Sequence, residues 1–461
     1  MLSTLAIVIL LAPQIPGPQT PPPAPALGSP LLGGVPTGTA TAQPLDLSLA
    51  DAIDRALAHN LGLLLAEQGV RAARGTHEEA LGDVLPHLNG RFSAARQKIN
   101  LEAFGFTGVS GLPTLVGPFN VFDTRLFLSD ELDLKGIYKA HAESDRVEAA
   151  RWSYRDVREL VVLVTGNLYL KALADQGRIE SARAALETAR SLHQLAVDRK
   201  AAGLAPGVDV LRADVEARSR EQRLIAAENR FARSKLDLAR AIGLPLGQDV
   251  RLTDTMPSPE PPPLAVDDAL QRAFLARADW KAAEARVRAA EDARRSARGE
   301  VLPGLSLGAD YGAIGQTVGG ALATYTLGAA VRVPLFQGGR VAGRVLAADA
   351  ALESARALRE DLRGRIDYEV RTATLDLQSA LARRGVAEEA ERLAHEQLRQ
   401  AQDRFAAGVA SNLDVVQAQQ AAAAAEEDTI SAAYDVNLAR AAMARGLGMA
   451  EEGFRQLVRG H

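Results

Sequence analysis

The sequence predicts a mainly helical fold with a small strand component, in which duplicated long-helix hairpins alternate with four strands. Three observations predict it: long stretches without proline, an internal duplication, and paired segments of alternating polarity. Residues 119–205 and all residues after Pro334 lack proline, which breaks helix interiors. A continuous helix from about Gly136 to Ala202 would be roughly 100 Å long at 1.5 Å per residue. Such a helix is far longer than a globular domain needs.

The chain repeats itself once. Leu47–Leu88 aligns with Leu264–Leu305 at an offset of 217 residues, and both segments end on Val-Leu-Pro-x-Leu. Later in each half, Asp198–Val210 and Asp403–Val415 share Asp-Arg-x-Ala-Ala-Gly-x-Ala followed by Asp-Val. Two anchors in the same order indicate a duplication with a period of about 210 residues, too long for a solenoid unit. Each half is therefore a structural unit in its own right.

Within each half, two segments of about ten residues alternate between larger apolar and smaller or polar side chains. They cover about 88–97 and 119–129 in the first half, and about 305–312 and 324–333 in the second. A period of two predicts half-buried strands, and segments of this length are also typical of lipid-facing barrel strands. Four strands cannot close a barrel, because the smallest bacterial barrels have eight. Three copies of the chain would supply twelve.

Proline and hydropathy divide the rest of the chain. Ten of the 22 prolines fall between Pro13 and Pro44, so we expect a leader without structure over residues 1–44. Its apolar run Leu2–Ala12 is shorter than a spanning helix but long enough for a signal-peptide core. We therefore expect export; the alternatives are a disordered tail or a wrongly assigned start. The expected units are 45–250 and 264–448, joined by a proline-rich linker over 251–263 and followed by a tail over 449–461.

Composition and motifs argue against several classes of protein. A net charge of −4 does not suit a nucleic-acid binder, and the absence of cysteine excludes thiolate chemistry. None of the seven histidines falls in an HExxH pattern, and no GxxxxGK or GxGxxG motif is present. We therefore expect no enzyme activity, no cofactor and no metal.

The sequence resembles the TolC-like outer-membrane efflux protein family. The resemblance covers Leu47–Leu447 and rests on the duplicated helix starts, the Val-Leu-Pro strand entries, Val333-Pro-Leu-Phe-x-Gly-Gly339 and the paired Ala-Gly turns. It implies a homotrimer with a twelve-stranded β-barrel in outer-membrane lipid and a helical tunnel across the periplasm. It also implies that the protein is an exit duct of an efflux pump or type I secretion system. The partners implied are a periplasmic adaptor protein and an inner-membrane transporter of RND, ABC or MFS type.

The resemblance places a gate at the two helix-hairpin turns. Asp414 matches the first position of an acidic ring round the pore, and Gln417 stands where family members have a second acid. Asp209 matches the acceptor of a latch whose tyrosine and arginine are replaced here by Phe405 and Ala410. Tip residues that could contact the adaptor are Gly203, Leu204, Val208, Leu211 and Arg212 at one turn, and Gly408, Val409 and Leu413 at the other.

Structural interpretations of these residues remain open. Asp209 and Asp414 each lie a few residues after a glycine turn, where a carboxylate favours a helix N-terminus. Gly203 and Gly408 fit helix C-caps, and the apolar tip residues could simply pack within the chain. The strand charges Arg125, Asp310 and Arg332 are expected to face the barrel lumen, because Arg in mid-membrane costs about 2–4 kcal/mol.

A periplasmic coiled-coil scaffold without channel activity is the alternative function. It accounts for the long helices and the duplication. It does not require alternating strands with an apolar stripe, so the strands distinguish the two hypotheses.

Overall fold

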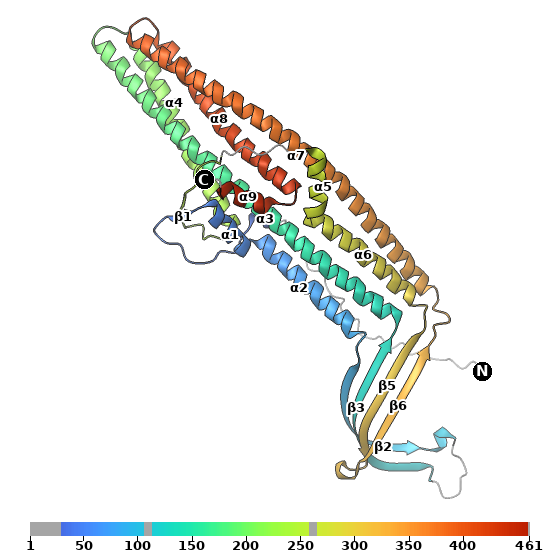
Figure 1. Ribbon diagram of the computed structural model, residues 1–461. Coiled ribbons are helices and arrows are strands. Elements are labelled where there is room, and N and C mark those ends of the chain that lie inside the picture. The colour runs from blue at the N-terminus through green and yellow to red at the C-terminus, as the bar shows by residue number, and fades with distance from the viewer. Residues whose placement is uncertain (1–28, 106–112, 258–264, 460–461) are drawn as a thin grey trace, which may run out of the picture.

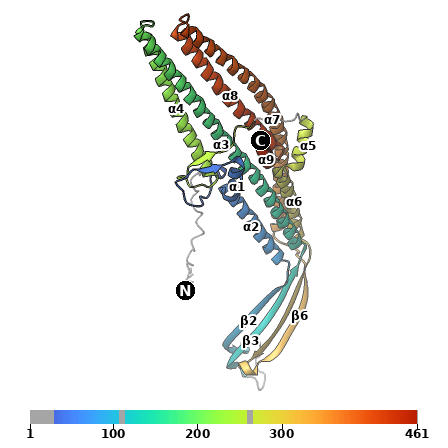
Figure 2. The same ribbon diagram turned by 60° about the vertical axis from the view of Figure 1, so that its left-hand side comes forward.

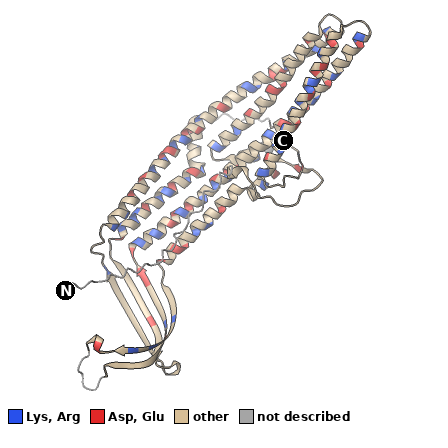
Figure 3. Ribbon diagram, turned by 180° about the vertical axis from the view of Figure 1, so that it is seen from behind, with Lys and Arg blue, Asp and Glu red and all other residues tan. Residues whose placement is uncertain are grey.

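The computed structural model describes residues 29–105, 113–257 and 265–459. The molecule is elongated, with long helices at one end and a four-stranded sheet at the other (Figure 1). Charged side chains are spread along the helices and are sparse on the sheet (Figure 3). The apolar run Leu2–Ala12, the C-terminal part of the linker and the middle of the loop after Asn100 lie outside the described residues.

The helices of the two halves correspond in order and length. The pairs have 11 and 11, 22 and 22, 68 and 67, and 35 and 35 residues. This match confirms the expected duplication of long hairpins. In the first half they are α1 (Leu49–His59), α2 (Leu61–Gly82), α3 (Leu134–Ala201) and α4 (Gly207–Ala241). In the second half they are α5 (Val266–Ala276), α6 (Ala278–Gly299), α7 (Arg340–Ala406) and α8 (Asn412–Gly446).

Each long hairpin is a pair of antiparallel helices, α3 with α4 and α7 with α8. The hairpins lie against each other along α3 and α8, and both hairpin turns lie at the end of the molecule away from the sheet (Figure 2). Small side chains such as Ala189, Ala196 and Ala422 are buried along the helices, which permits close approach of the helix backbones. Across the described residues, no helix is both long enough and apolar enough to cross a membrane.

The sheet contains the four expected strands. The bounds of each strand differ by a few residues from those of the predicted segment. They are β2 (His87–Asn100), β3 (Leu115–Leu132), β5 (Gly304–Gly315) and β6 (Leu322–Arg332). Their order is β2-β3-β5-β6, with every neighbouring pair antiparallel. The two halves therefore meet at the β3–β5 pair, and β2 and β6 form the edges.

A small second sheet lies near the middle of the molecule (Figure 1), and we call this region the waist. Strand β1 (Leu45–Leu47) pairs in parallel with β4 (Val250–Leu252). Beside it, the buried Tyr169 of α3 donates its hydroxyl hydrogen bond to the Leu47 carbonyl oxygen, 2.9 Å away, or to the Asp254 carboxylate, 2.8 Å away. The largest cluster of buried apolar side chains lies here, joining α1, α3, α4 and the two strands.

Three segments expected to lack structure contain some. In the leader, Pro30–Leu32 forms a 3-10 turn, and the amide of Val35 donates to the His59 carbonyl oxygen over 2.9 Å. In the linker, the Pro257 carbonyl oxygen accepts a hydrogen bond from the side chain of Asn437. The expected tail begins with α9 (Ala450–Arg459), whose Phe454 is buried in the waist. Each segment buries apolar surface of the helices or forms hydrogen bonds with their polar groups.

Candidate functional site

The strand register divides the sheet into two chemically different faces. Asp123, Arg125 and Glu131 alternate with Leu126 and Leu128 along β3. Because strand side chains point alternately to opposite faces, the register can be followed across the sheet. The face without Arg125 carries Phe92, Leu126, Leu128, Leu305, Leu307, Tyr311, Tyr325, Leu327 and Val331. Most of the side chains on this apolar face are exposed.

The opposite face carries most of the strand charges, while Asp130 and Arg96 lie on the apolar face. Arg125 donates to Asp310 over 2.6 Å and to Asp123 over 2.8 Å. Arg332 donates to Glu131 over 2.6 Å on the same face. The structure therefore brings Arg125 and Asp310 into direct contact, while Arg332 lies farther along the sheet toward the helices.

Gly312 lies opposite Arg125 in the register. A Cβ atom at Gly312 would lie 2.2 Å from the Thr124 carbonyl oxygen and 2.4 Å from Arg125 Cγ. Both distances are well below van der Waals contact, so a larger residue would displace the arginine or the strand. The absence of a side chain at Gly312 thus permits the Arg125 ion pairs.

Both hairpin turns are built around a glycine in the left-handed conformation. The φ angle is +73° at Gly203 and +79° at Gly408. The amide of Leu204 donates to the Arg199 carbonyl oxygen, and the amide of Val409 donates to that of Arg404. These bonds from the third residue after each helix satisfy otherwise free C-terminal carbonyls. The glycines therefore serve as helix caps, and the turns carry the neighbouring residues to the tip.

Asp414 caps the helix that follows its turn. Its carboxylate accepts hydrogen bonds from the Ser411 amide and hydroxyl, both over 3.0 Å, while Ser411 Oγ accepts from the Asp414 amide. This is a complete capping box. The bond from the Ser411 amide, then that from its hydroxyl, lowers the pKa of Asp414 below its ordinary value. Both Asp414 and Gln417, one turn later, are exposed.

Asp209 is not the counterpart of Asp414 in its contacts. Helix α4 begins after Pro206 without a side-chain cap, and the Asp209 carboxylate lies 3.6 Å from Arg212 one turn along its own helix. Its backbone carbonyl oxygen accepts a hydrogen bond from Asn412 Nδ2 over 2.9 Å. A capping box thus involves Asp414 and not Asp209. Asp209 still lies in the first turn of α4, where a carboxylate interacts favourably with the helix dipole.

Phe405 forms the second contact between the tips. Its side chain is only 4% exposed. The Arg199 guanidinium carbon lies 4.7 Å from the Phe405 ring centroid, and Arg199 Nη1 also donates to the Phe405 carbonyl oxygen. A cation over an aromatic face is attracted by the ring quadrupole. Ala410 is half-buried beside this turn, and its methyl side chain cannot donate a hydrogen bond to Asp209.

Sequence reasoning missed Arg199 and Asn412. Arg199 lies in the last turn of α3, where a basic residue is explained by the helix dipole alone. Asn412 is the first residue of α8, beside the more conspicuous Ser411 and Asp414. Their distance of more than 200 residues from their partners left no local signal.

The outer surface of the tips is apolar. Leu204 is 70% exposed, and Val208, Leu211, Val409 and Leu413 are also exposed. Arg212 is the exposed cation among them. These side chains therefore leave a large share of their apolar surface uncovered by the rest of the chain.

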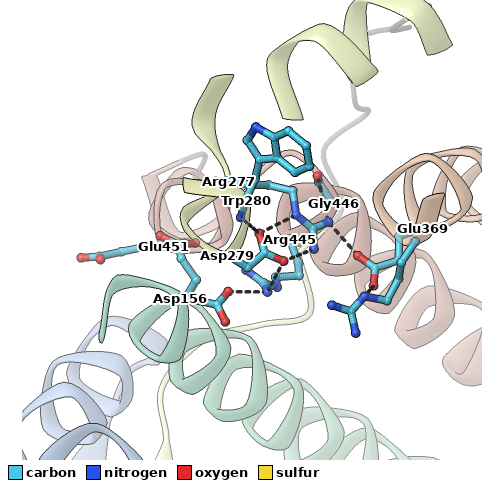
Figure 4. Close-up of polar contacts among 10 residues, drawn as sticks. Asp156, Arg277, Asp279, Trp280, Glu369, Arg445, Gly446 and Glu451 are labelled. Atoms are coloured by element: carbon cyan, nitrogen blue, oxygen red, sulfur yellow. Dashed lines mark hydrogen bonds and ion pairs between the residues drawn. The ribbon is translucent and has the colours of Figure 1, made fainter. Parts of the chain in front are cut away.

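A buried ion cluster lies at the waist (Figure 4). Arg277, 1% exposed, donates to Asp279 over 2.7 Å and to Glu369 over 2.6 Å. Arg445 donates to Asp156 over 2.6 Å. Burial raises the pKa of Asp156; at Asp279 burial acts the same way, but the Arg277 hydrogen bond and charge lower its pKa overall. The cluster joins α3, α6, α7 and α8.

The described part of the chain holds no group of three or more acidic, histidine or cysteine side chains that could bind a metal.

Comparison with known proteins identifies the fold. The chain superimposes on the outer-membrane protein VceC of Vibrio cholerae with a TM-score of 0.74 at 23% identity, over 87% of this chain and 96% of that one. The CmeC channel of Campylobacter jejuni gives a TM-score of 0.74 at 18% identity, over 96% and 97%. These structures confirm the expected fold class.

Sequence comparison points the same way. The pyoverdine export outer membrane protein OpmQ of Pseudomonas aeruginosa is 27% identical over 411 residues, covering 86% of this chain and 83% of that protein. Outer membrane protein OprJ of the same organism is 25% identical over 434 residues, covering 90% and 86%. The outer membrane efflux protein family matches residues 52–244 and 269–449. The chain therefore belongs to the outer membrane efflux protein family, as the resemblance predicted.

Proposed function

We propose that this outer membrane efflux protein is the trimeric exit duct of a tripartite pump. In this proposal an inner-membrane transporter of RND, ABC or MFS type passes cargo through a periplasmic adaptor to the duct. The observation that carries the proposal is the sheet, which has one apolar face, one charged face and two edges without a partner among the described residues.

The edges support closure by three copies. Strands β2 and β6 run in opposite directions, because each neighbour in the sheet is antiparallel to the last. The β6 edge of one copy can therefore continue the antiparallel order with the β2 edge of the next. Three copies make a barrel of twelve strands, an even number in the range of bacterial barrels. The apolar face would meet lipid, and Arg125, Asp310 and Arg332 would line the lumen.

Exposed apolar side chains on the helices support the same assembly. Leu375, Val386 and Leu393 are exposed along α7, and Val215 and Ile225 along α4. Helices α4 and α7 lie at opposite sides of the helical layer, since most contacts between the hairpins are made by α3 with α8. Packing α7 of one copy against α4 of the next would cover both stripes and close a tunnel.

The adaptor is proposed to bind the apolar tips. Leu204, Val208, Leu211 and Arg212 of one turn, with Gly203, and Gly408, Val409 and Leu413 of the other would form this surface. Exposed apolar groups at the end of a hairpin suit docking by another helical hairpin. Small organic cargo is favoured over a secreted polypeptide, because relatives are named for pyoverdine export and toluene efflux.

The first test is the mass of the detergent-extracted protein, measured by light scattering after outer and inner membranes are separated. A trimer from the outer-membrane fraction is the expected result. A monomer or dimer released without detergent would contradict the proposal and restore the scaffold as the better explanation.

We further propose that the closed pore is held by contacts that differ from the family's latch. Arg199 with Phe405, and Asn412 with the Asp209 carbonyl, join the two hairpins of one copy at the tip. Asp414 and Gln417 of three copies would surround the opening, with Ala410 beside it. Phe405→Ala and Arg199→Ala should raise single-channel conductance in planar bilayers, whereas Arg212→Ala, which removes only an exposed contact within α4, should not.

The acidic ring has its own test. Asp414→Ala should reduce cation selectivity, because it removes three carboxylates from the opening. Ser411→Ala is the matched control, since it removes the helix cap but keeps the carboxylate. Unchanged selectivity in Asp414→Ala, or an equal loss in Ser411→Ala, would leave Asp414 with a capping role alone.

A further inference from the structure

A groove with an unusual concentration of arginine lies between the α3–α4 hairpin and α8, away from the tips. Its volume is about 650 Å³, and alanines from all three helices line it. Arg178 of α3 and Arg220, Arg223 and Arg230 of α4 also line it. Neither the sheet, the tips nor the ion cluster at the waist includes these residues.

Arg220 is the informative member of this set. Its side chain is 3% exposed. Its Nε donates to Glu216 Oε1 over 2.7 Å, but its Nη2 is buried and has no hydrogen-bond partner within the described residues. A buried donor left without an acceptor costs about 1–3 kcal/mol, and more when the group is charged. The groove thus holds a buried N–H that lacks an acceptor.

The acids near the groove do not supply that acceptor. Glu216 accepts from Arg220 Nε, and its other oxygen lies 3.4 Å from Gln420 Nε2. Asp175 and Glu427 both pair with Arg178, over 3.0 and 2.8 Å. These acids therefore leave Arg220 Nη2 without an acceptor among the described residues.

Arg223 and Arg230 leave further charge uncompensated. Both are exposed at the rim of the groove, about one and three helical turns along α4 from Arg220. Neither forms an ion pair with any described residue of the chain. A water molecule could satisfy Arg220 Nη2, but the positive charges of Arg223 and Arg230 beside it favour an anion over a neutral molecule.

We propose that this groove binds an oxyanion, the carboxylate or phosphate group of a small polyanionic ligand. The planar guanidinium fork matches both groups and binds them through paired, charge-assisted hydrogen bonds. The ligand's acidic group would accept from Arg220 Nη2 inside the groove, and its remaining charge would face Arg223 and Arg230. Since α8 belongs to the other hairpin, the ligand would lie between the two hairpins of one copy.

The test is isothermal titration calorimetry of the full-length, detergent-extracted protein at low ionic strength, with citrate and with inorganic phosphate as separate probes. Saturable binding of one ion per chain is expected for at least one probe, and the probe that binds more tightly identifies carboxylate or phosphate as the preferred group. The measurement does not depend on channel activity, so it is independent of the proposed function.

Variants separate a site from general charge attraction. Arg223→Ala combined with Arg230→Ala changes only exposed residues and should weaken binding at least tenfold; Arg220→Met should abolish it. The matched control is Arg218→Ala, an exposed arginine of the same helix that pairs with Asp214 and Glu221 outside the groove. Absence of saturable binding with both probes, or an equal loss in Arg218→Ala, would overturn the proposal.

Discussion

The two halves of the chain build the same junction with different chemistry. Asn60 lies between α1 and α2, and Arg277 lies at the equivalent position between α5 and α6, 217 residues later. Both side chains are almost fully buried. Each donates to a carbonyl in the last turn of its own half's final hairpin helix, Asn60 to Ala241 and Arg277 to Gly446. The duplication has thus kept a contact while changing the residue that makes it.

The junction at Asn60 uses hydrogen bonds from one neutral side chain to backbone groups. Asn60 Oδ1 accepts from the Gly62 amide over 2.9 Å, and its Nδ2 donates to the Leu31 and Ala241 carbonyls over 2.8 and 3.1 Å. One amide side chain satisfies a helix N-terminus and two distant backbone groups. No buried charge has to be compensated at this junction.

The junction at Arg277 depends on a network of ion pairs. Arg277 requires Asp279 and Glu369, and Asp279 also lies 3.8 Å from Arg445, which pairs with Asp156. A buried charge is tolerated only when it is paired and hydrogen-bonded. The second junction therefore ties together more helices than the first, and it depends on more residues.

The largest expected effect comes from Arg277→Met, which keeps side-chain volume but removes the charge. Asp279 would be left buried without its main partner, so we expect a loss of roughly 3–5 kcal/mol of stability. Chemical unfolding of the detergent-extracted protein measures it. The control Arg288→Ala removes a half-exposed pairing with Asp145 and Glu148 and should cost less than about 1 kcal/mol.

Asn60→Ala tests the neutral junction. It removes three hydrogen bonds and leaves two buried carbonyls without this donor, so we expect a loss of about 2 kcal/mol. The same unfolding measurement applies, with the exposed Asn229→Ala as control. A loss as large as that of Arg277→Met would show that charge adds nothing to the cost of breaking this junction.

The two hairpin turns differ in a similar way, and Ser411→Ala tests that difference. Helix α8 begins with a capping box and α4 begins after Pro206 without a side-chain cap. Removing the cap should cost about 1 kcal/mol locally. Hydrogen exchange of the first-turn amides of α8 should then rise toward the rates at the start of α4. Unchanged exchange would mean that tip packing, and not the cap, protects this turn.

The smallest effect concerns the charge of Asp414. Its pKa is lowered chiefly by the Ser411 amide, so the capping contribution is complete above the ordinary value of 3.8 and is lost as the pH falls through the lower folded value. An NMR titration of labelled aspartate should place Asp414 below 3.8, and Ser411→Ala should move it upward. A folded value above 3.8 would contradict the capping geometry.

Much of the fold could be predicted from the sequence because its signals are local. Proline-free stretches predicted α3 and α7, alternation predicted β2, β3, β5 and β6, and the Val-Leu-Pro repeat predicted where the strands begin. The same reasoning predicted no secondary structure for residues 29–44 or for the segment that forms α9. These segments carry little periodicity of their own, and they are ordered by surfaces that exist only after the helices have packed.

The sequence by itself determined the long helices, the strand segments, the duplication and the glycine turns, because backbone preferences and side-chain periods act over a few residues. Only the tertiary structure decided that Arg199 stacks on Phe405, that Arg277 meets Glu369, and that Arg220 keeps a free donor in a groove. Each of these depends on helices from different parts of the chain crossing at a particular level. A shift of one helical turn between two hairpins changes every such pairing and leaves the local patterns of the sequence unaltered.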